Sequence, residues 1–302
     1  MDGDLLLELA RTACPSWDVD LVVSKSSKHN VQLGRETAAS GVDAVLACGG
    51  DGTLNAVLNG VRQSGADVIL GTIPAGTANV WGREARIPRS DPAGALALLE
   101  GGRIVSADVG VAGLRGKDYR FLLMCSVGLD AAVVADVEEH DRLKDLLAQG
   151  AFAILGTRVL ARFQPVRVRV QTDADPEDTQ RSLLMGVAGN TRLYGGVVEV
   201  TGDARADDGL LDLAWFEARA GWAGVADRAR ELVRLASKGD RALASKRAGR
   251  VLITPERALP VQADGEYLGV CGPEAPLQLS VEPGAIHLLI APGASPLFKD
   301  EA

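Results

Sequence analysis

Residues 43–60 read DAVLACGGDGTLNAVLNG, and this stretch decides the fold of the first third of the chain. The run DAVLAC predicts a buried strand, because it is short, largely apolar and followed by glycines. From Thr53 onward apolar residues recur at helical spacing, which predicts a helix with one buried face. The residues on that face are Leu54, Val57, Leu58 and Val61. Gly49, Gly50 and Gly52 lie between the two elements, so the stretch is a strand, a glycine turn and a helix.

The glycine turn is suited to binding an anion. Without Cβ atoms, its backbone lets a ligand come close to the N–H groups. The helix that follows adds amides without helical acceptors and the positive end of a helix dipole, so phosphate is the expected ligand. Asp51 in this turn is typical of a site that also binds a metal ion or a hydroxyl group. A plain tight turn between a strand and a helix is the alternative reading of the same residues.

A second glycine loop follows the next predicted strand. The strand ADVILGTI (66–73) leads into PAGTANVWGREARIP (74–88), where Gly76, Thr77 and Asn79 offer a backbone amide, a hydroxyl and a side-chain amide. Ligands of open α/β sheets bind beyond the carboxyl ends of parallel strands, so two such loops predict a nucleotide crevice. The sequence contains no GxxxxGK[ST] loop, no GxGxxG after the first strand and no protein-kinase signature.

The order of predicted elements divides the chain into parts of different class. Residues 1–104 alternate between helical and strand patterns, among them the predicted strand VDLVVS (19–24), and this alternation predicts a parallel α/β sheet. Later strand patterns follow one another, interrupted by two helical patterns at 132–163 and 222–248, which predicts an antiparallel sandwich or barrel. We expect an α/β nucleotide-binding domain at 1–104, a β-rich domain at 105–285, and a closing strand and tail at 286–302 that returns to the first domain.

The overall composition excludes several classes of protein. A net charge of −8 and a pI near 5.0 argue against general nucleic-acid binding. The four cysteines form no CxxC pair and are typical of reduced thiols in a cytoplasmic protein, and the three distant histidines argue against a zinc site. No signal-peptide pattern opens the sequence, and no apolar run approaches the ~18 residues of a membrane-spanning helix. We expect a cytoplasmic protein whose contact with a membrane is peripheral.

A basic segment is the candidate for that membrane contact. Residues 227–250 carry eight arginine and lysine side chains, and Trp222 precedes them. Such a segment could face anionic lipid headgroups. Its other reading is an amphipathic helix that packs on the β-rich domain with a solvated basic face. The apolar stretch 146–160 is too short to span a bilayer and reads as a core helix or, alternatively, as a wall for lipid tails.

Further motifs follow in a specific order over nearly the whole chain. After the two glycine loops come SVGLDA (126–131), GNTRLYGGVVEVTGDARADDGLLDL (189–213), ADGEYL (263–268) and VEPGAIHLLIAP (281–292). Together they resemble the diacylglycerol kinase catalytic family, which includes bacterial lipid kinases and sphingosine kinases. The resemblance implies ATP bound in a cleft between two domains and transfer of its γ-phosphoryl group to a lipid hydroxyl, such as that of a diacylglycerol, at a membrane surface. GGDGT alone is similar in NAD kinases and phosphofructokinases, and the later motifs separate those families.

The resemblance also implies which residues bind the nucleotide. They come from the two glycine loops, with Ser24 added from the predicted strand 19–24. The full set is Ser24, Gly49, Gly50, Asp51, Gly52, Thr53, Gly76, Thr77 and Asn79.

Two acidic motifs carry the remaining implied roles. Asp208 aligns with the family's magnesium ligand, together with the backbone carbonyls of Arg205 and Leu210, and such oxygen-only ligation suits Mg²⁺. The ion would either hold the loop or take part in catalysis. Asp264 and Glu266 are the candidates for the general base that accepts the alcohol proton. Taken alone, the DG pairs of both motifs are also common turn signals.

Three features depart from the family pattern. Family members usually begin with a strand that ends in N-P-x-[SA]-G, whereas this sequence begins in the following helix. Ala56 stands where the family usually has glutamate, and Val80 where it has aspartate. Two alternatives therefore stay open: an NAD kinase-like phosphotransferase, or a catalytically weak regulator that binds ATP and lipid and lacks the first strand. A missing strand would also leave a sheet edge unpaired, which favours a homodimer.

Overall fold

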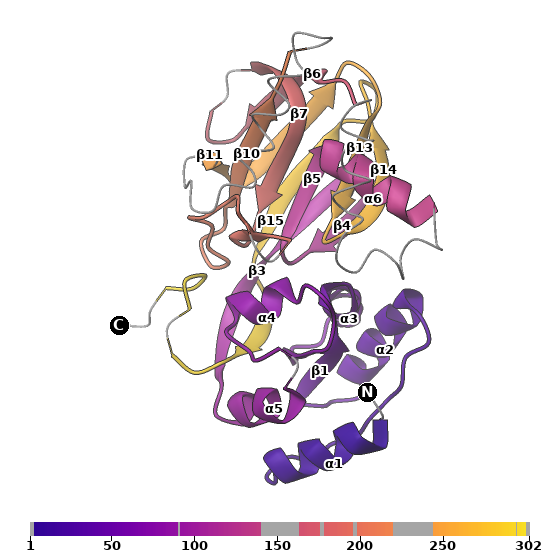
Figure 1. Cartoon of the computed structure of the whole chain (residues 1–302), viewed down its shortest axis with the longest axis vertical. Coiled ribbons are helices and arrows are strands. Elements are labelled where there is room, and N and C mark those ends of the chain that lie inside the picture. Colours follow the sequence, from indigo (N-terminus) through magenta and orange to yellow (C-terminus); the bar gives the residue numbers. More distant parts are fainter. Residues whose placement is uncertain are drawn as a thin grey trace. The chain divides into compact units, whose positions relative to one another are not determined.

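The computed structural model describes residues 3–89, 91–139, 163–175, 178–195, 198–219, 244–293 and 295–299. The chain divides into two compact units (Figure 1): unit 1 comprises Met1–Asp108 and Pro283–Ala302, and unit 2 comprises Val109–Glu282. Strands β3 (Arg103–Leu114) and β15 (Leu277–Ile290) each continue from one unit into the other. The apolar stretch 146–160 and the part of the basic segment before residue 244 lie outside the described residues.

Unit 1 is an α/β unit. Its remaining elements are α1 (Gly3–Ala13), α2 (Ser27–Ala39), β1 (Ala44–Gly49), α3 (Asp51–Ser64), β2 (Ile69–Pro74), α4 (Val80–Glu84) and α5 (Pro92–Glu100). Strands β1 and β2 run parallel, with Ala44 opposite Ile69, and the end of β15 pairs in parallel with the other edge of β2. Both predicted strands and the helix between them are therefore confirmed.

Local sequence explains where several of these helices begin and end. The Ser26 side chain accepts a hydrogen bond from the His29 amide at the start of α2. Asp91 does the same for the Gly94 amide at the start of α5, where proline occupies the first turn. Helix α3 ends at Gly65, whose positive φ of 71° is favourable only for a residue without a Cβ atom.

Two glycines let α2 and α3 pack closely. A Cβ atom on Gly60 would lie 2.1 Å from the carbonyl oxygen of Val31, and one on Gly34 would lie 2.6 Å from the carbonyl oxygen of Val57. At each contact, a glycine of one helix lets the backbone of the other helix approach it closely. This close packing fixes α3, whose first turn follows the first glycine loop.

The predicted strand at residues 19–24 is wrong. The segment between α1 and α2 is extended, but it is not a strand, and Val22 and Val23 are 59% and 70% exposed. A β-strand needs a neighbour for its backbone hydrogen bonds, and among the described residues β1 pairs only with β2. The apolar run VDLVVS has the composition of a strand, but the described part of the chain provides no partner for it.

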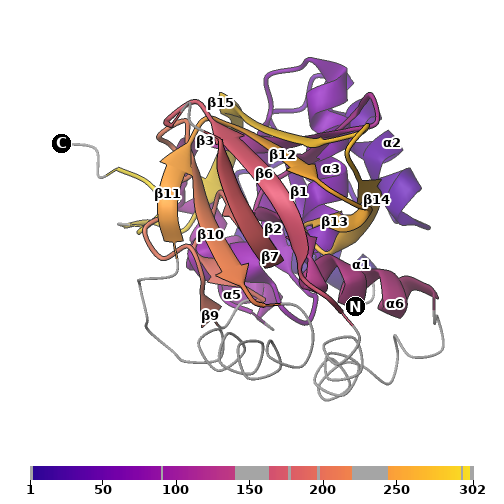
Figure 2. The same ribbon diagram turned by 90° about the horizontal axis from the view of Figure 1, so that it is seen from above.

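Unit 2 consists mostly of antiparallel strands. Besides the ends of β3 and β15 it contains β4 (Lys117–Phe121), β5 (Met124–Gly128), α6 (Leu129–Glu139), β6 (Val166–Thr172), β7 (Thr179–Gly189), β8 (Leu193–Tyr194), β9 (Val198–Glu199), β10 (Leu211–Glu217), β11 (Ala244–Ala248), β12 (Arg250–Pro255), β13 (Leu259–Ala263) and β14 (Glu266–Cys271). Figure 2 shows β6, β7, β10 and β11 side by side in a curled sheet, in agreement with their pairing. The inward faces of these strands enclose one apolar core.

The fold class predicted from the sequence is confirmed, since an α/β unit with a parallel sheet is joined to a β-rich antiparallel unit. One boundary differs. The helical pattern expected at 222–248 does not extend to its end, because residues 244–248 form strand β11 beside β10. Among the described residues, no helix has the length and apolar character needed to cross a membrane.

Candidate functional site

In unit 1, the two glycine loops lie against each other. Because β1 and β2 are parallel neighbours, both loops emerge at the same edge of the sheet. The Ala75 amide donates to the Gly49 carbonyl at 2.9 Å, and a Cβ atom on Gly76 would lie only 2.4 Å from the Cα of Gly50. Together the loops line a hollow of about 150 Å³ with Leu54, Thr72, Trp81 and Gly82.

Two predicted nucleotide ligands bind the protein's own backbone. The Asp51 carboxylate accepts hydrogen bonds from the amides of Val80 (2.9 Å) and Trp81 (3.0 Å), and so joins α3 to α4. The Asn79 side chain accepts from the Gly76 amide at 3.0 Å and donates to the Gly76 carbonyl at 2.7 Å. Asn79 adopts a positive φ of 46°, which its short polar side chain tolerates. Asp51 and Asn79 therefore shape the loops from within.

The other predicted nucleotide ligands face outward to different degrees. Gly52 and Thr77 are exposed, and a Cβ atom on Gly52 would meet nothing within 4 Å. The first turn of α3 leaves backbone amides without helical acceptors, and those amides are the donors available to an anion. Ser24 lies in the extended segment before α2, where its hydroxyl donates to the Ser26 carbonyl at 3.2 Å.

In unit 2, Asp264 anchors a turn. Asp264 and Gly265 have positive φ angles of 48° and 83° and connect β13 to β14. The Asp264 carboxylate accepts hydrogen bonds from three consecutive backbone amides, those of Leu122 (2.8 Å), Leu123 (3.0 Å) and Met124 (2.9 Å). Glu266, the first residue of β14, is exposed. The two predicted base candidates thus have different surroundings.

A network of side chains holds the same turn from the opposite side. The Gly265 amide donates to Gln262 Oε1 at 2.9 Å, and Gln262 Nε2 donates to Asp130 Oδ2 at 2.7 Å. The hydroxyl groups of Ser126 and Tyr194 also donate to the Asp130 carboxylate. Loss of hydration and the negative charge of Asp130 raise the pKa of Tyr194 well above its ordinary value, so its hydroxyl stays a donor. Residues from two sequence motifs, together with Gln262 of β13, therefore meet at Asp130.

The network includes residues that the sequence analysis did not single out. Gln262 stands two positions before Asp264, and Tyr194 lies inside the motif that begins at Gly189. Tyr194 therefore has the signal of a recognised motif, whereas Gln262 lies one position before the ADGEYL motif and has no such signal. Nothing in a linear pattern shows that two such residues converge on a third.

In the acidic loop before β10, the predicted magnesium ligand Asp208 is bonded to other groups of the protein. Asp208 Oδ1 accepts from the Leu210 amide at 3.1 Å, and Asp208 Oδ2 forms an ion pair with Arg247 Nη2 at 2.5 Å. Arg205 forms an ion pair with Asp207 at 3.1 Å through Nε. Among the described residues, no three His, Cys, Asp or Glu side chains gather into a group that could hold a metal ion.

Arg247 also pairs with a second, more deeply buried carboxylate. Its Nε lies 3.2 Å from Asp212 Oδ2, and the Asp212 side chain is only 2% exposed. Burial raises the pKa of Asp212 to about 6, although the positive charge of Arg247 and its hydrogen bond lower it. The Asp212 carboxylate is therefore ionised at neutral pH. Burying its charge is unfavourable, and the attraction to Arg247 offsets part of that free energy.

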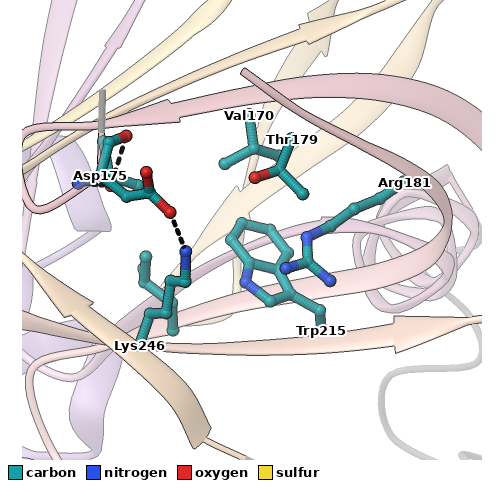
Figure 3. A pocket seen from close by; sticks show the side chains of 8 residues that line it. Val170, Asp175, Thr179, Arg181, Trp215 and Lys246 are labelled. Atoms are coloured by element: carbon teal, nitrogen blue, oxygen red, sulfur yellow. Dashed lines mark hydrogen bonds and ion pairs between the residues drawn. The ribbon is translucent and has the colours of Figure 1, made fainter. Parts of the chain in front are cut away.

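Another hollow, of about 250 Å³, lies on strands β6, β7, β10 and β11. Figure 3 shows Lys246 pointing toward Asp175, with which it forms an ion pair, and Arg181 beside the indole ring of Trp215. The Arg181 guanidinium carbon lies 5.3 Å from the ring centroid, and its Nη1 pairs with Glu217 at 2.6 Å. Both cations therefore already have carboxylate partners, and no predicted site residue lines this hollow. Lys246, counted in the basic segment, faces a carboxylate here.

Comparison with known protein families gives two matches. Residues 4–112 match the family described as "Diacylglycerol kinase catalytic domain". Residues 124–290 match the family described as "YegS C-terminal NAD kinase beta sandwich-like domain". These two ranges account for most of the chain and contain both glycine loops, the acidic loop and the ADGE turn.

Individual proteins agree with the family matches. The chain is 32% identical over 283 residues to a Pseudomonas putida protein named "Probable lipid kinase YegS-like", covering 94% of this chain and 88% of that one. It is 29% identical over 231 residues to a "Diacylglycerol kinase" of Staphylococcus saprophyticus, covering 75% and 71%. The solved structure of a protein described as a diacylglycerol kinase from Bacillus anthracis has the same fold, with a TM-score of 0.70, 20% identity, and coverage of 97% and 93%.

Proposed function

Because the chain belongs to the family of the diacylglycerol kinase catalytic domain with a YegS-type C-terminal domain, we propose that it is an ATP-dependent lipid kinase. In this proposal, it transfers the γ-phosphoryl group of ATP to a hydroxyl group of a diacylglycerol-like lipid at a membrane surface. Such a reaction mostly requires positioning and charge stabilisation, together with a group that takes the alcohol proton.

The contact between the two glycine loops carries the nucleotide part of the proposal. Gly50 and Gly76 meet without side chains, and the exposed backbone beside them includes the first turn of α3. Amides at a helix start bind phosphate oxygens through hydrogen bonds and the helix dipole. Gly52 would admit the phosphates, and the exposed Thr77 hydroxyl would donate to one of them. Mg²⁺ enters this scheme as part of the MgATP substrate.

The ADGE turn carries the proton-transfer part. Three backbone amides already bind the Asp264 carboxylate, so its oxygen atoms are occupied in holding the turn. Glu266 follows the same turn as the first residue of β14, and it is exposed. Glu266 is therefore the group that takes the alcohol proton in our proposal, and Asp264 holds the turn that presents it. A weak base is sufficient, because the proton leaves late in a loose transition state.

The lipid part rests on the relatives, whose names state a lipid kinase and a diacylglycerol kinase. The second candidate is an NAD kinase-like phosphotransferase, because the family matched by residues 124–290 is described as NAD kinase beta sandwich-like. The two candidates differ only in the acceptor of the phosphoryl group. A comparison of acceptors therefore separates them.

The deciding experiment follows transfer of labelled γ-phosphate to diacylglycerol, phosphatidylglycerol, sphingosine and NAD, each supplied alone, with lipids in detergent micelles. We expect a labelled lipid that requires Mg²⁺ and is formed far more slowly by Glu266→Gln. Labelled NADP would instead establish the NAD kinase-like reaction. Folded protein that binds ATP and lipid vesicles but labels no acceptor would support the regulator alternative and contradict the kinase proposal.

A further inference from the structure

We propose that Arg247 takes, in the loop before β10, the place that the family resemblance gives to a divalent cation. The guanidinium group would bind the loop's carboxylates directly and make the loop independent of Mg²⁺. This role belongs to unit 2 alone and holds whether or not the chain is a kinase.

The fold brings the arginine to the loop through strand pairing. Strand β11 runs antiparallel to β10, and Arg247 stands directly opposite Asp212 in the register. Side chains at opposite positions of an antiparallel pair lie on the same face, with Cβ atoms about 4.5–5.5 Å apart. Arg247 therefore points along the same face as Asp212, toward the loop that leads into β10.

One guanidinium group then bonds to oxygen atoms from three positions. Its Nη2 donates to Asp208 Oδ2 at 2.5 Å and to the Asp203 carbonyl at 3.4 Å, and its Nε donates to Asp212 Oδ2 at 3.2 Å. The two carboxylates are well shielded from water, with side chains 11% and 2% exposed. The positive charge is thus placed where the negative charge of the loop is least solvated.

The same oxygen atoms explain why a cation is needed there. Two carboxylates and a backbone carbonyl form the kind of oxygen set that Mg²⁺ or Ca²⁺ uses. A planar guanidinium can satisfy several such oxygens at once and never loses its proton, which makes it an effective permanent counterion. A divalent ion on Asp208 would have to share that carboxylate with the guanidinium, and two cations at this distance repel each other.

Asp207, the acidic residue directly before Asp208, also forms an ion pair with an arginine. Asp207 pairs with Arg205, so each of the three carboxylates at positions 207, 208 and 212 has an arginine partner. No acid of this group is left for a metal ion alone. From sequence alone, Arg247 belongs to a basic segment that could face lipid headgroups or form the solvated face of a packed helix, whereas its described contacts are to this loop.

The test measures thermal unfolding of the full chain without nucleotide, first in excess EDTA and then in millimolar MgCl₂ or CaCl₂. We expect the same Tm for the wild type in all three solutions. Arg247→Gln should lower the Tm and should recover part of the loss on addition of a divalent ion, because the carboxylates then accept the ion in place of the arginine. Adding Asp208→Asn to Arg247→Gln should abolish that recovery.

Arg250→Gln is the matched control, since it removes an exposed arginine from the next strand and should leave the Tm unchanged in every solution. A wild-type Tm that falls in EDTA and returns with Mg²⁺ would overturn the proposal. So would an Arg247→Gln protein that no divalent ion restabilises, because Arg247 would then form only an ordinary ion pair. If Arg247→Gln does not fold, metal analysis of dialysed wild-type protein decides: a stoichiometric divalent ion would contradict the proposal, and its absence would support it.

Discussion

Gly50 and Gly76 lie so close together that a Cβ atom on Gly76 would lie 2.4 Å from the Cα of Gly50. The two glycine loops are separated in the sequence by a helix and a strand. Their backbones nevertheless touch at a point that leaves no room for a side chain. The contact is made of backbone, which cannot move aside as the end of a flexible side chain would. The geometry of the proposed phosphate site therefore depends on a pair of glycines.

Gly76→Ala should separate the two loops. We expect the free energy of unfolding to fall by about 1–3 kcal/mol, as for other overpacked sites, and ATP binding to weaken together with it. Chemical denaturation and calorimetric titration with MgATP measure the two effects. Gly101→Ala is the control, because a Cβ atom there meets nothing within 4 Å and the backbone φ is −91°. Equal affinity for ATP in Gly76→Ala would contradict the assignment of the site to these loops.

Asp264 and Glu266 should respond differently to neutral substitution. Asn in place of Asp264 retains only one acceptor oxygen for three amides, so stability should fall by about 1–3 kcal/mol, the usual cost of unsatisfied buried groups. Gln in place of Glu266 breaks no described bond, so its Tm should stay near that of the wild type while kcat falls by about 10²–10⁴, the range for a lost general base. Thermal unfolding and steady-state kinetics on the same preparations separate the two roles. A Glu266→Gln enzyme of full activity would remove Glu266 from the reaction.

Gln262 should act on the reaction through the turn that it holds. Gln262→Leu cannot accept the Gly265 amide or donate to Asp130, so the turn loses one of its two supports. We expect kcat to fall by up to about 10²-fold, as for other small displacements of reacting groups, with the KM for ATP unchanged. Gln262→Glu keeps an acceptor for the Gly265 amide but replaces the donor to Asp130 with a second carboxylate, so it should not restore kcat. A loss that appears equally in kcat, KM and Tm would indicate a purely structural residue.

The stability of unit 2 should depend on the titration of Asp212. Its pKa rises from 3.8 to about 6 on folding because the side chain is buried. The folded state therefore binds a proton more tightly than the unfolded state, and this contribution to stability is present below about pH 4 and lost as the pH rises through about 6. Over this pH range, the free energy of unfolding of the wild type should fall by about 2–3 kcal/mol relative to that of Asp212→Asn. Each unit of pKa shift corresponds to about 1.36 kcal/mol. Urea denaturation at a series of pH values measures the free energy of unfolding of both proteins. A difference between them that does not change with pH would contradict the raised pKa of Asp212.

Those parts of the fold that follow from local sequence could be predicted. The strand, glycine turn and helix at residues 43–60 depend on neighbours in the chain, and so do the alternating elements of unit 1. The segment 19–24 could not be predicted in this way, because an apolar run becomes a strand only if another strand pairs with it. Pairing is a property of the assembled sheet.

For the candidate site, sequence predicted that the two glycine loops lie together, but not what the side chains of the site residues bond to. Asp264 was a candidate base because it lies in a motif, whereas its acceptor atoms are taken by amides some 140 positions earlier in the chain. Asp51 likewise bonds to the start of α4 and closes the second glycine loop onto the first. Arg247 carried no signal of its own within a run of basic residues. In each case the deciding partner comes from a distant element, which linear spacing does not show.

Strand β15 has a consequence for how the chain is made on the ribosome. Residues 287 and 288 pair with β2, although β2 ends at residue 74, so the sheet of unit 1 stays incomplete until more than 200 further residues are synthesised. At about 5–20 residues per second, the early strands wait on the order of ten to forty seconds for that partner. During this time one edge of β2 is open to other chains. A chain that stops before residue 283 would leave that edge open permanently, so loss of the end of β15 should damage unit 1 as well.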